Sequence, residues 1–153
     1  MTIYEELLEE ANNSGLIVRE KTLSGSDGLI YKNRIAISNR LKTSAEKACV
    51  LAEEIGHHHT AVGDIFDLQD IENMKQEQKG RLHGYNRMIG LRGIISAFNA
   101  GCQNRYEVAE HLHVTEEYLQ EAIDCYKGKY GEYITVDNYV IYFIPNLAVM
   151  EMV

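Results

Sequence analysis

The chain has 153 residues, of which 45% are hydrophobic and 25% are charged, with one proline and 12 glycines. This length and composition are typical of one globular domain, alone or with a small appendage, and exclude a collagenous or disordered chain. The formal net charge of −8, from 15 basic and 23 acidic residues, argues against a dominant surface for nucleic acid or anionic membrane, because both surfaces need clustered cations.

The sequence shows no secretory or membrane-spanning signal. Its N-terminal residues are acidic and typical of a helix, and no run approaches ~18 consecutive apolar residues. The three cysteines, Cys49, Cys102 and Cys125, are odd in number and form no C-x-x-C motif. We therefore expect reduced thiols in a cytoplasmic protein that does not enter a membrane.

The first half of the sequence predicts two helices with short β segments between them. Each helix is opened by a Thr-x-x-Glu capping box, starting at Thr2 and at Thr43, and the second helix is expected from Ser44 to about His59. The β segments are expected at residues 16–20, 29–31 and 34–37. The last two segments surround a tight turn and should form a hairpin.

The second half predicts further helices and a terminal β-hairpin. The helices are expected at 73–88, 91–100, 105–113 and 116–127, and the hairpin strands at 133–136 and 139–143. The spacing of the last two helices is typical of a helix-turn-helix pair. We therefore expect an α+β fold with a core at 1–90, on which the part at 91–153 packs with its helical pair and hairpin.

The segment E-E-I-G-H near the end of the second helix is the strongest chemical signal. Glu53 and His57 are four residues apart, so both side chains can reach one point in space, and Glu54 lies beside them. At ~100° of rotation per residue, these three side chains point away from the core-facing arc. That arc comprises Ala48, Ala52, Ile55 and His59. We therefore expect His59 to be a packed histidine.

This spacing is the geometry of the H-E-x-x-H motif, with Glu53 at the position of the first histidine. In that motif the two histidines bind zinc and the glutamate acts as general base on the water that the metal activates. A carboxylate is also a zinc ligand, so Glu53 can replace the imidazole. The alternative is a helix end with exposed charges, where histidines suit the helix dipole.

A catalytic zinc site needs a third protein ligand. Asp64, which follows soon after the helix, and Glu77, on the next predicted helix, are the two candidates. His58 is a further candidate, which could replace Glu53 or Glu77 as a ligand. His83 points to the far side of its helix and is a poor candidate.

Glu77 lies on a helix face that carries two glycines. Gly80, Arg81 and Gly84 follow it at spacings of 3, 4 and 7, and glycines allow a helix to approach another backbone closely. This arrangement favours a position of Glu77 opposite His57. The alternative is a surface ion pair between Glu77 and Arg81, which is worth only ~0.3–0.5 kcal/mol.

These residues resemble the ImmA/IrrE family of metallopeptidases, in the short form found in prophages and mobile elements of Gram-positive bacteria. The matching stretches are residues 45–57, 60–65, 75–88 and 104–139. The resemblance thus covers nearly the whole chain. It implies a zincin-like active-site helix packed on a small antiparallel sheet, and an endopeptidase that cleaves a helix-turn-helix repressor to relieve repression.

The resemblance also implies roles for individual residues. His57 and Glu77 would be zinc ligands, and Glu54 would be the general base. Glu53 stands where the family has a histidine, so the metal is either a weakly held zinc or a harder ion such as manganese. Gly80 stands where the family usually has alanine, and we expect that difference to be sterically neutral.

Two other functions compete with the peptidase. The first is a non-catalytic antirepressor, a protein-binding module on the same fold. The second is a DNA-binding regulator, which needs cations or amides on its recognition helix. The second helix of the pair instead carries acidic residues before its first lysine: Glu116, Glu117, Glu121 and Asp124. We therefore expect a protein partner and no direct contact with nucleic acid.

Overall fold

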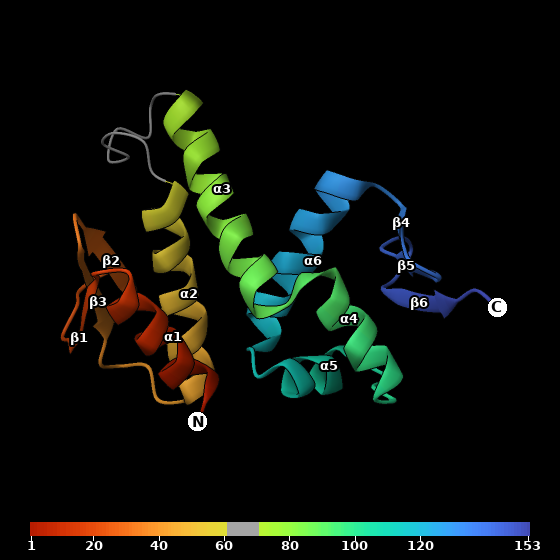
Figure 1. Cartoon of the computed structure of the whole chain (residues 1–153), viewed down its shortest axis with the longest axis horizontal. Coiled ribbons are helices and arrows are strands. Elements are labelled where there is room, and N and C mark those ends of the chain that lie inside the picture. Colours follow the sequence, from red (N-terminus) through yellow and green to blue (C-terminus); the bar gives the residue numbers. More distant parts are fainter. Residues whose placement is uncertain (61–70) are drawn as a thin grey trace. The chain divides into compact units, whose positions relative to one another are not determined.

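The computed structural model describes residues 1–60 and 71–153, with the side chains of these ranges except at positions 71–74 and 76. The fold is α+β, as predicted. The chain divides into two compact units, Met1–Arg87 and Met88–Val153, and each unit has its own helices and its own three-stranded sheet (Figure 1).

The first unit follows the order of elements that the sequence predicts. Its elements are α1 (Ile3–Asn13), β1 (Ile17–Lys21), β2 (Gly28–Tyr31), β3 (Arg34–Ser38), α2 (Ser44–Thr60) and α3 (Ile71–Met88). Both predicted capping boxes are present: the hydroxyl groups of Thr2 and Thr43 accept hydrogen bonds from the backbone N–H groups of Glu5 and Glu46. Each cap satisfies an N–H group that has no partner within its own helix, and so fixes where that helix begins.

The sheet of the first unit has β3 at its centre and is mixed. β2 pairs antiparallel with β3, as the predicted hairpin requires, whereas β1 pairs with β3 in parallel. The expectation of an antiparallel sheet is therefore wrong for β1. The chain reverses direction between β1 and β2 and again between β2 and β3, and β1 lies on the other side of β3 from β2. β3 consequently runs parallel to β1.

The core of the first unit lies between this sheet and two helices. α1 and α2 lie on the same side of the sheet, and α3 runs beside α2 (Figure 1). Ile35 and Ile37 of β3 are buried toward the helices, together with Leu7 of α1 and Leu51 of α2. Burial of a side chain of this size stabilises the fold by ~1.5–3 kcal/mol. The helix that carries the E-E-I-G-H segment is thus anchored on the sheet.

A charged contact also fixes α3 within the first unit. The Arg87 guanidinium near the end of α3 donates two hydrogen bonds to the Glu10 carboxylate on α1, from Nη2 at 2.5 Å and from Nε at 3.0 Å to Oε1. Such hydrogen bonds between charged groups are stronger and more directional than those between neutral groups. α3 is therefore tied to α1 at this end.

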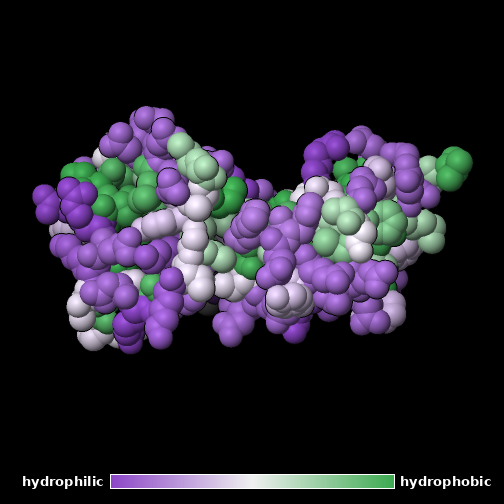
Figure 2. Space-filling model, turned by 90° about the horizontal axis from the view of Figure 1, so that it is seen from below, coloured by the Kyte–Doolittle hydropathy of each residue, from purple (hydrophilic) through white to green (hydrophobic). Residues whose placement is uncertain are grey.

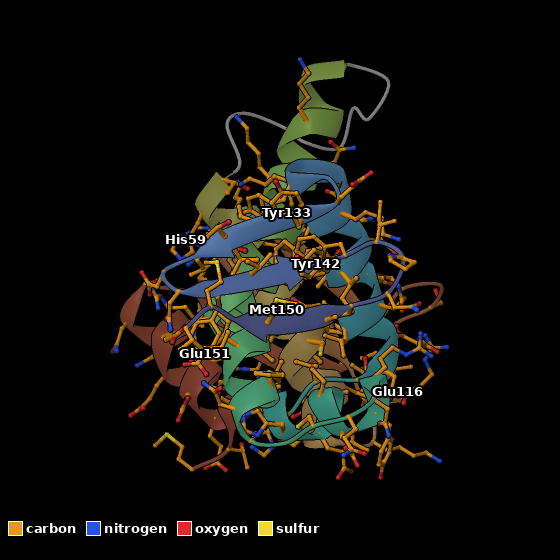
Figure 3. All side chains as sticks on the ribbon, turned by 90° about the vertical axis from the view of Figure 1, so that its right-hand side faces the viewer. His59, Glu116, Tyr133, Tyr142, Met150 and Glu151 are labelled. Carbon is orange, nitrogen blue, oxygen red and sulfur yellow. The ribbon has the colours of Figure 1, made fainter. Side chains whose placement is uncertain are left out.

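The second unit is a helical group with a small antiparallel sheet. Its elements are α4 (Gly90–Asn99), α5 (Arg105–Leu112), α6 (Glu116–Tyr130), β4 (Tyr133–Val136), β5 (Tyr139–Tyr142) and β6 (Ala148–Glu151). The predicted hairpin is present as β4 and β5, and β6 adds a third strand that the sequence did not predict. Figure 3 faces this sheet, where Tyr133 and Tyr142 are cross-strand neighbours with ring centroids 5.9 Å apart.

The core of the second unit is apolar and aromatic. Leu119 and Tyr126 of α6 are fully buried, as is Ile141 of β5, and the Phe143 ring lies against Tyr126 with centroids 6.4 Å apart. The acidic side chains of α6 that argue against a DNA-recognition helix are exposed: Glu116, Glu117, Glu121 and Asp124. Among the described residues, no helix has both the length and the apolar character needed to cross a bilayer.

Candidate metal centre

Three side chains from two helices of the first unit form a group that could hold a metal ion. Glu53 and His57 come from successive turns of α2, and Glu77 comes from α3. One ligand atom from each of the three lies within 4.8 Å of the others. His57 Nε2 is 3.3 Å from Glu77 Oε1 and 3.7 Å from Glu53 Oε1. The structure thus brings together the three residues that the sequence selected.

Two predictions about side-chain exposure on α2 are wrong. Glu54 and His57, expected to point away from the core, are only 9% and 6% exposed. His59, expected to be packed, is exposed, and its ring lies tilted beside that of His83 with centroids 5.3 Å apart. The reason for the burial differs between the two residues: Gly80 of α3 lies against the His57 imidazole, whereas Gly28 of β2 lies against Glu54. α3 is strongly polar, so it has no apolar stripe from which its packing against α2 could be predicted.

Glycines bring α2 and α3 into backbone contact, as the sequence predicts. A Cβ atom on Gly56 would overlap the carbonyl oxygen of Gly80 and would press on the backbone nitrogen of Gly84. A Cβ on Gly80 would overlap His57 Nδ1. The expectation that alanine is harmless at position 80 is therefore wrong for this chain, because the imidazole occupies that space.

Arg81 contacts both carboxylates of the group. Its Nε lies 3.3 Å from Glu53 Oε1 and 3.4 Å from Glu77 Oε1. The surface pair between Glu77 and Arg81, weighed as an alternative from the sequence, is therefore present together with the approach to His57. The sequence did not show that Arg81 also reaches Glu53, since that contact depends on how α3 lies against α2.

The charges in this group shift the pKa values of its members in opposite directions. The nearby His57 imidazole lowers the pKa of the Glu53 carboxyl, and the Arg81 charge adds to this effect against the opposing effect of burial. Burial disfavours the His57 imidazolium, but the nearby carboxylates of Glu53 and Glu77 outweigh it, so the pKa of His57 is raised.

Glu54 has a different environment from its neighbour Glu53. Burial raises the pKa of its carboxyl to about 7, and the negative charges of Glu53 and Glu77 act in the same direction. Gly28 on β2 allows this burial, because a Cβ at that position would press on Glu54 Cγ and overlap the side chain of Val50. A carboxyl group with a pKa near 7 can both accept and release a proton at neutral pH.

The donor set fits a divalent transition metal. Two carboxylate oxygens and one imidazole nitrogen are ligands that zinc accepts, and oxygen-rich sets also suit manganese. His57 directs Nε2 toward both carboxylates, while its Nδ1 is buried with no hydrogen-bond partner in the described part of the chain. The ring is therefore oriented by its packing on Gly80 rather than by the second hydrogen bond that most metal-bound histidines make.

The other ligand candidates lie elsewhere. Asp64 is outside the described residues. His58 is half-buried and is not part of the group, and its ring lies edge-on to that of His59 with centroids 5.5 Å apart. His83 pairs with His59 and is not a member of the group either, as the sequence predicts.

Comparisons with protein-family models, with curated proteins and with solved structures found no match for the chain. The functional inference therefore depends on the geometry around Glu53, His57 and Glu77, and on the resemblance of the sequence motif.

Proposed function

We propose that the chain is a metal-dependent endopeptidase of a prophage or mobile element that cleaves a helix-turn-helix repressor and so relieves repression. The observation that carries the catalytic part is the convergence of Glu53, His57 and Glu77 beside a buried glutamate with a pKa of about 7. Titratable groups with such shifted pKa values gather at functional sites. The repressor as substrate is supported by the family resemblance.

Each of the four residues has a distinct role in this proposal. Glu53, His57 and Glu77 hold the metal, which we propose to be zinc or, with this donor set, manganese. A divalent ion there would polarise a peptide carbonyl and a water molecule. Glu54 accepts a proton at its carboxylate from the attacking water and donates it to the departing amine, which its pKa near 7 allows.

Arg81 favours a second candidate function, a non-catalytic antirepressor that binds its target without cutting it. Its guanidinium already pairs with the same two oxygens that would bind the metal. With His57 protonated, two cations balance two carboxylates, and the cluster is a neutral network of ion pairs. Such a network stabilises the contact between α2 and α3 without any metal ion.

Metal content distinguishes the two functions. Protein without a histidine tag would be dialysed against zinc or manganese, freed of excess ion, and analysed for its elements. The peptidase requires about one ion per chain, lost in His57→Ala and in Glu77→Gln but kept in the matched control Glu117→Gln on the exposed face of α6. No ion retained under either condition would refute the peptidase.

A trapping experiment tests the substrate. Glu54→Gln removes the proposed proton acceptor and leaves the three ligands in place, so it should hold a substrate without cleaving it. Proteins captured by this variant would be incubated with the wild-type chain and metal, and new N-termini would be identified by mass spectrometry. Cleavage of a captured helix-turn-helix protein supports the proposal. Capture without cleavage by the metal-loaded wild type favours the antirepressor.

A further inference from the structure

Within the described part of the chain, no helix covers the face of the β1–β3–β2 sheet that lies opposite α1 and α2, and we call it the open face. Side chains alternate between the two faces of a strand, so the neighbours of the buried Ile35 and Ile37 point the other way. Three apolar side chains remain exposed on the strands: Ile17 at 41%, Leu29 at 51% and Tyr31 at 62%. Figure 2 shows hydrophobic side chains gathered at the end of the first unit that holds the sheet, bordered by hydrophilic ones.

Strand register arranges the side chains of this open face in rows. One row is Ile17, Arg34 and Tyr31, and the next is Arg19, Ala36 and Leu29. Ala36 on the central strand has the shortest side chain of its row and forms the floor of a depression. The depression has a cavity volume of about 480 Å³, which is within the range of sites that bind small ligands or peptide side chains.

The charged side chains that line this depression are all cations: Arg19, Lys21 and Arg34. None of them forms an ion pair with a carboxylate in the described part of the chain. Glu20, between two of them, points to the helix side, where it pairs with Lys47 at 3.0 Å. A positive face with apolar side chains is unusual on a chain with a net charge of −8. Its charge is complementary to that of an acidic partner.

We propose that this open face binds a segment of a partner protein in which acidic residues are interspersed with apolar ones. Its carboxylates would pair with Arg19, Lys21 and Arg34, and its apolar side chains would cover Leu29 and Tyr31. The inference concerns the face of the sheet opposite α2, so it holds whether or not the metal centre is catalytic.

Nucleic acid fits this face less well than an acidic peptide. Proteins that bind nucleic acid typically neutralise ~6–10 phosphates, whereas this depression offers three cations on a chain that is otherwise acidic. Phosphates would also leave Ile17 and Leu29 without apolar partners. Acidic peptide side chains satisfy the cations, and neighbouring apolar ones bury the exposed aliphatic surface.

The test is fluorescence anisotropy with a short fluorescein-labelled peptide in which glutamates alternate with leucine and phenylalanine. The proposal expects binding that weakens with added salt. It expects Arg19→Glu with Arg34→Glu to weaken binding at least about tenfold, since two attractions become repulsions. Leu29→Ser should weaken it to a smaller extent. Lys42→Glu, a charge reversal at an exposed position off this face, is the matched control and should resemble the wild type within the mutational error.

Four outcomes would overturn the proposal: no binding of the acidic peptide, equal binding of a peptide with lysines in place of glutamates, tighter binding of oligothymidylate at equal salt, or a dimer in sedimentation velocity that the double variant abolishes. The last two would identify nucleic acid or a second copy of this chain as the occupant. Circular dichroism of each variant would verify the fold, and Leu29→Ser provides a test that leaves every charge in place.

Discussion

The two units of the chain differ in what they bury. Among its described residues, the first unit buries three polar side chains, Ser38, Glu54 and His57; His57 is a member of the candidate metal centre, and Glu54 lies beside it. The second unit, all of whose residues are described, buries hydrophobic and tyrosine side chains and no charged one. Burial of a charged or titratable group costs free energy unless the group is paired. Burial of titratable groups therefore costs the first unit stability, and the described core of the second unit carries no such cost.

The largest expected effect tests the stability of the second unit. Leu119 is fully buried on α6, so Leu119→Ala should lower the free energy of unfolding by about 3–5 kcal/mol through lost burial and a cavity. Urea titration followed by circular dichroism measures this loss. Zinc affinity at the metal centre of the folded variant should equal that of the wild type. A change in affinity would show that the two units are not functionally separate.

A smaller loss is expected where α2 meets α3. Gly56→Ala should cost about 3 kcal/mol, because the new methyl group meets the backbone of Gly80, which has no side chain that can move aside. Gly128→Ala in α6 is the matched control: a Cβ there meets nothing within 4 Å, and alanine should stabilise that helix by about 0.5–1 kcal/mol. Equal effects at the two positions would contradict the close approach of the helices.

The pH dependence of stability sharpens the contrast between the units. The carboxyl of Glu54 has a pKa of about 7 in the folded chain against 4.5 as its ordinary value, so folding favours its protonated form. This stabilisation is complete below the unfolded pKa and is lost as the pH rises through 7. Glu54→Gln should therefore make the metal-free protein more stable at pH 9 by about 3 kcal/mol, with little change at pH 4.

Urea titrations of the wild type and of Glu54→Gln at both pH values measure this difference. Glu117→Gln, on the exposed surface of α6, serves as the control and should alter the pH dependence much less. Parallel pH profiles for the wild type and Glu54→Gln would show that the buried carboxyl does not destabilise the first unit.

The smallest expected effect concerns Arg81. Its guanidinium repels a divalent ion, but the side chain is 54% exposed and solvent screens its charge. Arg81→Ala should therefore raise zinc affinity by only about threefold, measured by isothermal titration calorimetry. The control is Arg92→Ala, which removes an exposed arginine that pairs with Asp137 in the second unit. Weaker zinc binding in Arg81→Ala would mean that the guanidinium positions the ligands instead.

Local signals in the sequence predicted most elements of the fold. The capping boxes at Thr2 and Thr43 and the hairpin turns depend on neighbours in the chain, so sequence reveals them. The parallel pairing of β1 with β3 depends on where distant segments meet, and β6 is a short edge strand with only intermediate or exposed side chains. Neither the parallel pairing nor β6 produces a periodic pattern in the sequence from which it could be predicted.

The ligands of the candidate site could be predicted from the sequence, but the environment of those ligands could not. The spacing of Glu53 and His57 depends only on their positions within one helix, and the same is true of the face that Glu77 and Gly80 share. The burial of Glu54 depends on its contact with Gly28 of β2, and the contact between Arg81 and Glu53 depends on α3 lying against α2. The exposure of His59 was mispredicted because the apolar arc of α2 does not extend to its last turn.

The glycine contact between α2 and α3 has a consequence for how such a chain can change over generations. Gly56 and Gly80 lie where the backbones of α2 and α3 meet, whereas the proposed ligands Glu53 and Glu77 have side chains that are 34% and 26% exposed and contribute little packing. A ligand can thus be exchanged, histidine for glutamate included, while the helices stay in place. The proposed peptidase and the proposed antirepressor could therefore share one backbone and differ only in their ligand side chains.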